Sequence, residues 1–215
     1  YGKVTTTKVD EEYPKNRLSG ATFVVYRDSN GNKEFDKADK VCGEMKEVKK
    51  GIYELANLTY GGYFLYEKTT PEGYVRDTEY HYFEIKTDKE TVTVENKTGV
   101  GFANRKITGE LDITKKDVSN GDLLPDAGFR IKDEKGKTVV EGYTDKNGLA
   151  KFTLTYGKYT YEEFDAPDGY IIDTTPHPFE ISKDGEIVKA EMTNKAEEHE
   201  TPQTGDGNFG FLIGI

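Results

Sequence analysis

Three residue types recur in the same order in both halves of the chain: a lysine, a glutamate and an asparagine. The lysines are Lys8 and Lys115, the glutamates are Glu67 and Glu163, and the asparagine of the second half is Asn194. An unprotonated ε-amine can attack the carbonyl carbon of an asparagine side chain, while a glutamic acid polarises that carbonyl and shuttles protons as ammonia leaves. Burial favours the neutral forms of lysine and glutamate. A buried group of these three types therefore suits a condensation.

The elements expected to position these side chains are short strands. Segment 3–9 alternates so that Lys8 shares a face with apolar and small neighbours, and segment 187–194 does the same for Asn194. Lys115 closes a similar alternating segment that begins at Leu111. Because one face of such strands is buried and their register is then strongly specified, these side chains are expected to point inward.

The two halves are copies of one unit. Eight residues recur in order at a constant offset of 96 residues: Tyr60, Tyr63, Glu67, Pro71, Gly73, Tyr74, Phe83 and Ile85 return as Tyr156, Tyr159, Glu163, Pro167, Gly169, Tyr170, Phe179 and Ile181. The opening strands of the copies are separated by 106 to 107 residues, so the first copy holds about ten extra residues, which coincide with 28–40. The repeated unit has the size of a small domain.

Composition predicts an all-β fold with one β-sandwich per copy. Tyrosine is frequent (15 residues), and turn dipeptides such as Asn30-Gly31 and Asn147-Gly148 interrupt the chain at short intervals. No stretch shows a long apolar period of 3.6 residues. Many short antiparallel strands joined by turns are typical of β-sandwiches. We expect domains at 1–104 and 105–195, followed by a tail at 196–215.

The charge and the few reactive side chains argue against several functions. A net charge of −10 disfavours nucleic acid and anionic membranes as partners. One cysteine and three histidines offer no disulfide framework, no zinc spacing and no recognisable nucleophile–histidine motif. The chain is not expected to be an enzyme.

The asparagine of the first copy has two candidates. Asn96 continues the alternation of Val92 and Val94, and it needs only a two-residue change in a turn relative to Asn194. Asn104 also follows an apolar residue by two positions, but it requires a six-residue insertion relative to the second copy. We favour Asn96 because register is strongly specified where one face of a strand is buried.

Combined motifs in both copies resemble the Cna protein B-type (SpaA-like pilin) domains of Gram-positive surface proteins. The motifs are Lys8-Val9-Asp10, Leu18-x-Gly-Ala21-x-Phe23 and Glu67-x-x-x-Pro71-Glu72-Gly73-Tyr74, with Lys115-Lys116-Asp117, Ala127-x-Phe129 and Glu163-Phe164-Asp165-Ala166-Pro167-Asp168-Gly169-Tyr170 in the second copy. The resemblance covers about 195 residues and implies two tandem immunoglobulin-like or prealbumin-like sandwiches. It further implies an autocatalytic isopeptide bond between lysine and asparagine in each domain. Glu67 and Glu163 would assist these single-turnover reactions.

A further motif, Thr201-Pro202-Gln203-Thr204-Gly205, resembles the LPxTG cell-wall sorting signal, with threonine in place of leucine. The resemblance implies cleavage by a sortase between Thr204 and Gly205 and attachment to peptidoglycan. The apolar run at 209–215 is far shorter than the ~20 residues that span a bilayer, so the anchor is expected to be truncated. The implied location is the extracellular cell wall of a Gram-positive bacterium.

The insertion in the first copy carries oxygen-bearing side chains at the spacing of a calcium loop. Positions 1, 3, 5, 7, 9 and 12 of that count are Asp28, Asn30, Asn32, Glu34, Asp36 and Asp39. The sixth position is Lys33, where the sharp turn of such a loop favours glycine. A solvated hairpin loop is the favoured alternative, and calcium is the one cofactor considered.

These observations favour a structural function, the stalk of a wall-anchored adhesin or pilin. The expected partners are sortase and peptidoglycan, with other pilin subunits or a host surface ligand as further candidates. The alternative is a module that binds a host protein or glycan, with calcium in the first domain.

Overall fold

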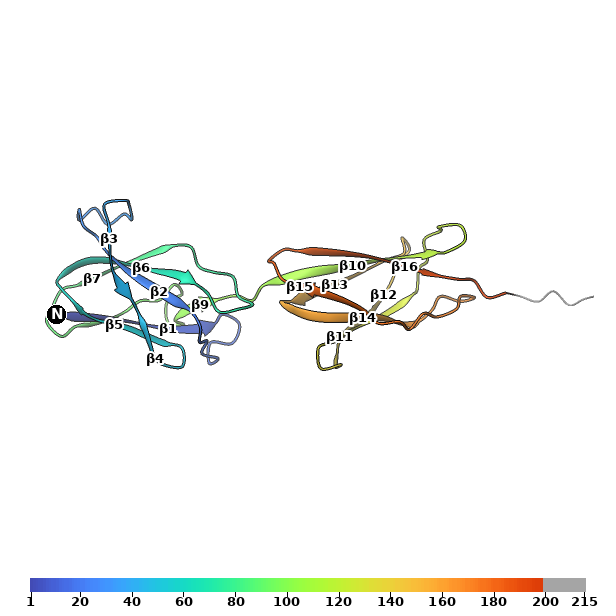
Figure 1. The fold of residues 1–215 in the computed structure, drawn as a ribbon, viewed down its shortest axis with the longest axis horizontal. Coiled ribbons are helices and arrows are strands. Elements are labelled where there is room, and N and C mark those ends of the chain that lie inside the picture. Colours follow the sequence, from blue (N-terminus) through green and yellow to red (C-terminus); the bar gives the residue numbers. More distant parts are fainter. Residues whose placement is uncertain (199–215) are drawn as a thin grey trace, which may run out of the picture.

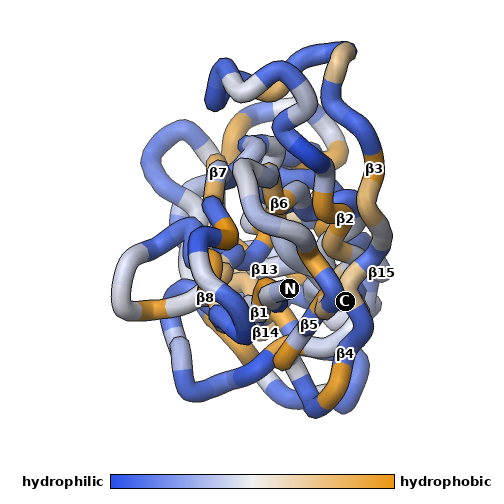
Figure 2. Tube along the Cα trace, turned by 90° about the vertical axis from the view of Figure 1, so that its left-hand side faces the viewer, coloured by the Kyte–Doolittle hydropathy of each residue, from blue (hydrophilic) through white to orange (hydrophobic). Residues whose placement is uncertain are grey.

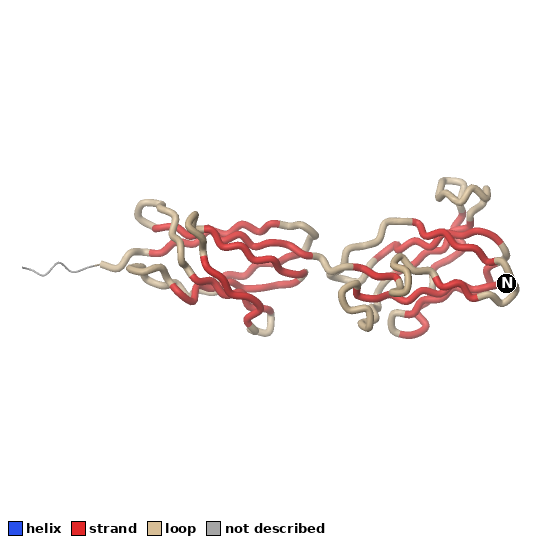
Figure 3. Tube along the Cα trace, turned by 180° about the vertical axis from the view of Figure 1, so that it is seen from behind, coloured by secondary structure: helices blue, strands red, loops and turns tan. Residues whose placement is uncertain are grey.

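The structure, a computed structural model, describes residues 1–198. Within these residues, sixteen strands form two units that follow one another along the chain and lie end to end (Figure 1). Figure 3 shows only strands and loops in the described residues, which confirms the predicted all-β fold class. Residues 1–198 contain no helix that is long and apolar enough to cross a membrane.

The first unit contains two sheets. One has the order β4-β5-β1-β8, with β9 also paired to β1, and the other has the order β3-β2-β6-β7. The strands are β1 (Gly2–Asp10), β2 (Thr22–Arg27), β3 (Lys40–Glu44), β4 (Lys46–Lys49), β5 (Ile52–Leu58), β6 (Gly61–Thr69), β7 (Tyr80–Ile85), β8 (Thr91–Thr93) and β9 (Phe102–Asn104).

The second unit repeats this architecture with fewer strands. Its sheets have the orders β13-β10-β16 and β12-β11-β14-β15. The strands are β10 (Thr108–Asp117), β11 (Gly128–Asp133), β12 (Thr138–Tyr143), β13 (Leu149–Thr155), β14 (Gly157–Asp165), β15 (His177–Ile181) and β16 (Ile187–Asn194). The predicted domain boundary at 104/105 falls between β9 and β10.

Each unit has a hydrophobic core between its two sheets. In the first unit Phe23, Tyr53 and Phe102 form an edge-to-face aromatic group, with ring centroids 4.8 and 5.1 Å apart. The second core is more aliphatic, with Leu111 and Ile113 fully buried. Figure 2, viewed along the long axis, shows hydrophilic loops around apolar strands.

The first and last strands of each unit are parallel neighbours, and this pairing positions the candidate residues. Lys8 lies opposite Phe102 in the β1–β9 pair, and Lys115 lies opposite Met192 in the β10–β16 pair. Burial alternates along both first strands, so that Lys8 and Lys115 face the core. The predicted inward face of these strands is therefore confirmed.

The insertion of the first copy is mostly one loop. Residues 28–39 connect β2 to β3, whereas residues 134–137 connect the equivalent β11 and β12. Figure 1 shows this loop projecting beside β3, away from the joint between the units.

The last strand of the first unit is divided into two short strands. β8 and β9 both pair in parallel with β1, but residues 94–101 lie between them, with a turn closed by a hydrogen bond from the Val100 N–H to the Lys97 carbonyl. The equivalent β16 is continuous. This division is the six-residue insertion that Asn104 requires.

Candidate functional site

Lys115, Glu163 and Asn194 meet inside the second unit. Their exposed fractions are 0, 1 and 2%. Lys115 Nζ lies 3.0 Å from Glu163 Oε1, and Asn194 Nδ2 donates a hydrogen bond of 2.9 Å to the same oxygen. Glu163 comes from β14 in the opposite sheet, where it pairs with Phe129 of β11. The carboxylate thus bridges an amine and an amide that belong to the first and last strands.

Two atoms of this group lack a hydrogen-bond partner among the described residues. They are Asn194 Oδ1 and Lys115 Nζ, whose approach to Glu163 has the distance of an ion pair but not the direction of a hydrogen bond. A buried polar atom without a partner costs about 1–3 kcal/mol. The two unpaired atoms are the amide oxygen and the nucleophilic nitrogen that a condensation uses.

The first unit holds the same arrangement with Lys8, Glu67 and Asn104. Lys8 Nζ lies 3.6 Å from Glu67 Oε1, and Asn104 Nδ2 donates to both oxygens of Glu67, at 3.1 and 2.8 Å. All three are buried, and Asn104 Oδ1 has no partner among the described residues. Glu67 pairs with Phe23 as Glu163 pairs with Phe129, so the two groups occupy equivalent positions.

The structure places Asn104, and not the favoured Asn96, beside Glu67 in the buried group. Asn96 is only partly buried, and its side chain forms hydrogen bonds with the N–H and carbonyl of Ala103 and with the Asp77 carboxylate. The register pairs Asp10 with Asn104 as it pairs Asp117 with Asn194. Alternation along one continuous last strand would place Asn96 there, but the chain leaves the sheet after Val94 and re-enters it as β9.

Burial also sets the protonation of the lysines. Desolvation lowers the pKa of Lys8 to about 8, although Glu67 opposes this change by favouring the charged amine. Desolvation likewise lowers the pKa of Lys115, against the opposing effect of Glu163. Phe102 and Phe129 place ring centroids 5.4 and 5.6 Å from the respective amines. Burial thus shifts both amines toward the neutral, nucleophilic form, while the aromatic rings favour the charged form.

The sequence interpretation missed the groups that hold the glutamates. The backbone N–H of Asp77 donates to Glu67 Oε2 at 2.9 Å, and that of Asp173 donates to Glu163 Oε2 at 2.8 Å. These two aspartates obey the offset of 96, which could have identified them. Burial alone would raise the pKa of Asp77, but hydrogen bonds from His81, Asn96 and the Glu79 N–H lower it to about 2.

The shared Pro-x-Gly-Tyr motif has a local structural role. The Tyr74 hydroxyl donates to Asp10 Oδ2 at 2.8 Å, and the Tyr170 hydroxyl donates to Asp117 Oδ2 at 3.0 Å. Burial, and then the hydrogen bond to Asp10, raise the pKa of Tyr74 to about 12. Each aspartate lies two residues after its lysine, so the tyrosine holds the end of the first strand beside the candidate site.

The loop at residues 28–39 is held mainly by its own hydrogen bonds. Asp28 Oδ1 accepts from the Gly31 N–H, and Asp39 accepts from the N–H groups of Ser29 and Asp36. Within residues 1–198, no group of three or more His, Cys, Asp or Glu side chains is arranged to hold a metal. Calcium binding at Asp28, Asn30, Asn32, Asp36 and Asp39 stays a prediction. The sorting motif with Thr204 and Gly205 lies outside the described residues.

Comparison with known families places both units in one family. The family model of the SpaA prealbumin-like fold domain matches residues 2–98 and again residues 109–196. The chain belongs to the SpaA prealbumin-like fold domain family. This result confirms the predicted tandem SpaA-like domains and their fold.

Relatives of the two SpaA domains are found in longer proteins. The chain is 29% identical over 178 residues to serine-aspartate repeat-containing protein D of Staphylococcus aureus, covering 71% of this chain and 12% of that protein. The structure of the Bacillus anthracis TIE protein matches with a TM-score of 0.76 and 39% identity, over 90% of this chain and 34% of that one.

A third similarity concerns the fold alone. A C-terminal fragment of the pilus adhesin SpaC from Lactobacillus rhamnosus GG has a TM-score of 0.55 at 14% identity, over 93% of this chain and 99% of that one.

Proposed function

We propose that this chain is a stalk segment of an adhesin or pilin on the cell wall of a Gram-positive bacterium, and that an intramolecular amide bond closes each SpaA domain. The bonds join Lys8 to Asn104 and Lys115 to Asn194. The observation that supports them is the burial of the same three groups, in equivalent register, in both domains. Each bond forms once, so the protein does not act as an enzyme.

The reaction follows from the groups present. Lys115 Nζ attacks Asn194 Cγ, a new Nζ–Cγ bond forms, the Cγ–Nδ2 bond breaks, and ammonia leaves. Transfer of the lysine proton to Glu163 leaves a neutral pair, which is favoured where the charged pair is desolvated. Rotation of the Asn194 amide by half a turn places Oδ1 next to that acid proton, which polarises the carbonyl. As Glu163 gives its proton to the departing nitrogen, it takes the remaining extra proton from the attacking Nζ, so the products are a neutral amide, ammonia and protonated Glu163.

The bonds suit a protein under tension. The chain enters the second domain through β10 and leaves it through β16, so a pulling force would shear these parallel neighbours (Figure 1). A covalent bond between Lys115 and Asn194 carries the force directly from β10 to the end of β16. Residues 116–193 are then outside the path of the force. The Lys8–Asn104 bond does the same for the first domain.

Anchoring is the second part of the proposal. A sortase would cleave between Thr204 and Gly205 and join the chain to peptidoglycan, or to another subunit in a pilus. Binding of a host ligand is the alternative function. Large exposed apolar side chains of the described residues come from both domains, for example Val41, Tyr143 and Ile187, so they favour no single binding face.

Intact mass measurement of the purified chain tests the bonds. We expect a mass lower than that of the sequence by two molecules of ammonia, and tryptic peptides in which β1 is joined to β9 and β10 to β16. A folded protein with the unmodified sequence mass would rule out the proposal.

A further inference from the structure

The two domains meet at a joint in which the linker 105–107 is hydrogen-bonded on both sides. The Val75 N–H donates to the Arg105 carbonyl at 2.9 Å, and the Ile107 N–H donates to the Gly73 carbonyl at 2.8 Å. On the second domain, the Tyr156 N–H donates to the Ile107 carbonyl at 3.0 Å. The linker is therefore fixed to the Pro-x-Gly-Tyr turn of the first domain and to the end of the second domain at which its chain enters. We call the end at which the chain enters a domain its proximal end, and the end at which the chain leaves it the distal end.

Side chains complete this joint. Arg105 forms two hydrogen bonds with the Asp184 carboxylate, at 2.7 and 2.6 Å, in the bidentate geometry that gives directional specificity. The Tyr156 hydroxyl donates to Glu72 Oε1. Gly73 has a φ of +82°, and a Cβ on it would lie 3.1 Å from the Tyr156 ring. The joint therefore has two halves, whose names do not refer to hydrogen-bond direction. The donor half comprises Glu72, Gly73 and Arg105 at the distal end of the first domain and in the linker, and the receiver half comprises Tyr156 and Asp184 at the proximal end of the second domain.

The distal end of the second domain repeats the donor half. The Ile171 N–H donates to the Lys195 carbonyl at 2.9 Å and the Glu197 N–H donates to the Gly169 carbonyl at 2.8 Å, in the pattern of Val75 and Ile107. Asp168 and Gly169 stand at the positions of Glu72 and Gly73 by the offset of 96. The Lys195 side chain is 60% exposed, and among the described residues no atom beyond the adjacent residues would lie within 4 Å of a Cβ on Gly169.

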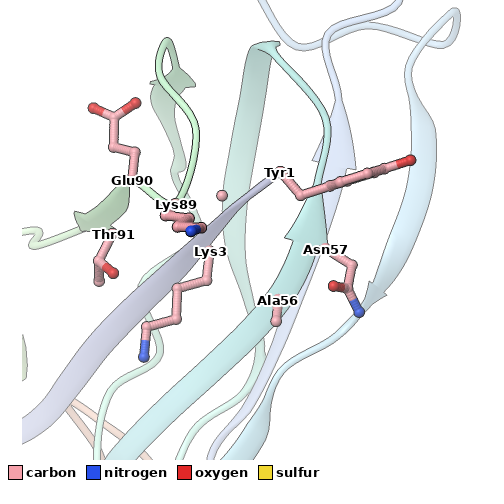
Figure 4. Close-up of a pocket in the computed structure, with 8 residues that line it drawn as sticks. Tyr1, Lys3, Ala56, Asn57, Lys89, Glu90 and Thr91 are labelled. Carbon is pink, nitrogen blue, oxygen red and sulfur yellow. The ribbon is translucent and has the colours of Figure 1, made fainter.

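The proximal end of the first domain repeats the receiver half. The Lys89 N–H donates to the Tyr1 carbonyl at 2.9 Å, as the Gly185 N–H donates to the Thr108 carbonyl at 2.8 Å. Tyr1 and Lys89 border an open cavity of about 220 Å³ at this end (Figure 4). Tyr60 and Asp88 stand at the positions of Tyr156 and Asp184 by the offset of 96.

The two receiver residues of the first domain are accessible. Tyr60 is 55% exposed, and the Asp88 side chain is 62% exposed. Asp88 already accepts an ammonium group, that of the Tyr1 amine, at 2.8 Å. The end therefore offers an aromatic ring and a carboxylate at the sequence positions equivalent to those that contact Gly73 and Arg105 at the joint.

We infer that the proximal end of the first domain is a docking face for the distal end of another SpaA domain joined in series. The required partner carries a cation for Asp88, a carboxylate for the Tyr60 hydroxyl and a glycine over the Tyr60 ring. The second domain of this chain itself has these three groups in Lys195, Asp168 and Gly169. The inference rests on the proposed stalk role, but it does not require the amide bonds.

A tandem protein tests this face. Because Glu197 matches Ile107 and Tyr1 matches Thr108, joining residue 197 of one copy directly to Tyr1 of a second copy reproduces the linker length of the joint. Nitroxide labels at Lys189→Cys of the first copy and Lys46→Cys of the second, in a Cys42→Ser background, report the new junction by pulsed electron paramagnetic resonance. The same labels placed within one copy report the Arg105–Asp184 joint as an internal reference.

We expect a single distance distribution at the new junction, as narrow as that of the reference joint. Asp88→Lys in the second copy should broaden it at least two-fold, and Lys195→Asp in the first copy should restore the narrow distribution. A control tandem with a Gly/Ser insertion after Glu197 gives the width of the distance distribution for an undocked junction. The inference would be overturned if the direct tandem gave a distribution as broad as this control. It would also be overturned if the charge variants left the distribution unchanged. The reference distance confirms folding, and intact mass of the same samples tests the amide bonds separately.

Discussion

The two domains place the same three groups together but hold them differently. Lys8 Nζ donates to the Phe102 carbonyl at 2.9 Å and lies 3.6 Å from Glu67, whereas Lys115 Nζ lies 3.0 Å from Glu163. These contacts differ although the repeat motifs match. The shared motif thus specifies which groups meet, and neighbouring residues specify how firmly each group is held.

A second difference lies beside the asparagines. Asn104 Nδ2 also donates to the Thr70 hydroxyl, and the equivalent position in the second domain is Ala166. The amide of the first domain is therefore fixed by an additional partner. We expect the second domain to react faster because both its amine and its amide have fewer competing hydrogen bonds.

The largest expected effect is loss of one covalent closure. Lys115→Met keeps most of the buried stem but removes the amine, so the chain should lose one ammonia instead of two. A bond across the roughly 80 residues from Lys115 to Asn194 should contribute about 4 to 5 kcal/mol in the loop-entropy model. Intact mass and denaturant unfolding of the second domain measure both effects.

Lys116→Met is the matched control for this variant. Lys116 is the next residue, and its amine pairs with Glu191 at the surface. Both ammonia losses should persist, with a stability change within about 1 kcal/mol. Two ammonia losses in Lys115→Met itself would contradict the assignment of the second domain.

The second test separates the two asparagines of the first domain. Asn104→Ala should abolish the loss of ammonia in that domain and leave the second domain unchanged. Asn96→Ala should retain both losses, because Asn96 contacts the Ala103 backbone and Asp77 instead of Lys8. Its cost should be about 1 to 3 kcal/mol, as expected for buried groups that lose a hydrogen-bond partner. If Asn96→Ala lost only one ammonia and Asn104→Ala lost two, Asn96 would be the reacting residue.

Much of the fold followed from residue patterns in the sequence. The strand period placed Lys8 and Lys115 on the buried face, and the repeat identified Glu67 and Glu163. Both inferences depend on local alternation or on direct comparison of the copies. They require no knowledge of how distant strands pair.

The choice between Asn96 and Asn104 depended on information that is not local. Nothing in residues 94–101 alone shows that the chain leaves the sheet and then pairs with β1 again as β9. The contacts of Tyr74 with Asp10 were hidden for the same reason, since they join segments 64 residues apart. The offset of 96 relates Asp77 to Asp173, but it does not show that their backbone N–H groups donate to the glutamates.

The third prediction concerns the pH dependence of the unreacted first domain. In Asn104→Ala the Lys8 amine stays free, with a pKa that burial lowers to about 8 from an ordinary value near 10.5. Between these pH values the unfolded chain binds more protons than the folded one, so the stability contributed by Lys8 rises with pH. The slope should be at most about 1.4 kcal/mol per pH unit.

Urea unfolding at several pH values measures this slope. The reference is Asn104→Ala combined with Lys8→Met, which lacks the titrating amine of residue 8. We expect the stability difference between the two proteins to change from about pH 8 upward in favour of the protein with Lys8. A difference that is constant between pH 7 and pH 10 would show that burial does not lower the pKa of Lys8.

The smallest expected effect comes from exchanging the residues beside the asparagines. The Thr70 hydroxyl holds Asn104 Nδ2, and the proposed reaction requires that amide to turn, so Thr70→Ala should accelerate bond formation in the first domain. One hydrogen bond of about 1 kcal/mol corresponds to roughly five-fold in rate. Ala166→Thr should slow the second domain by a similar factor. Unreacted protein refolded from denaturant, sampled over time and mapped by tryptic mass, gives both rates. If Thr70→Ala slowed the first domain, Thr70 would assist the departing nitrogen, and the two domains would differ because Ala166 lacks that assistance.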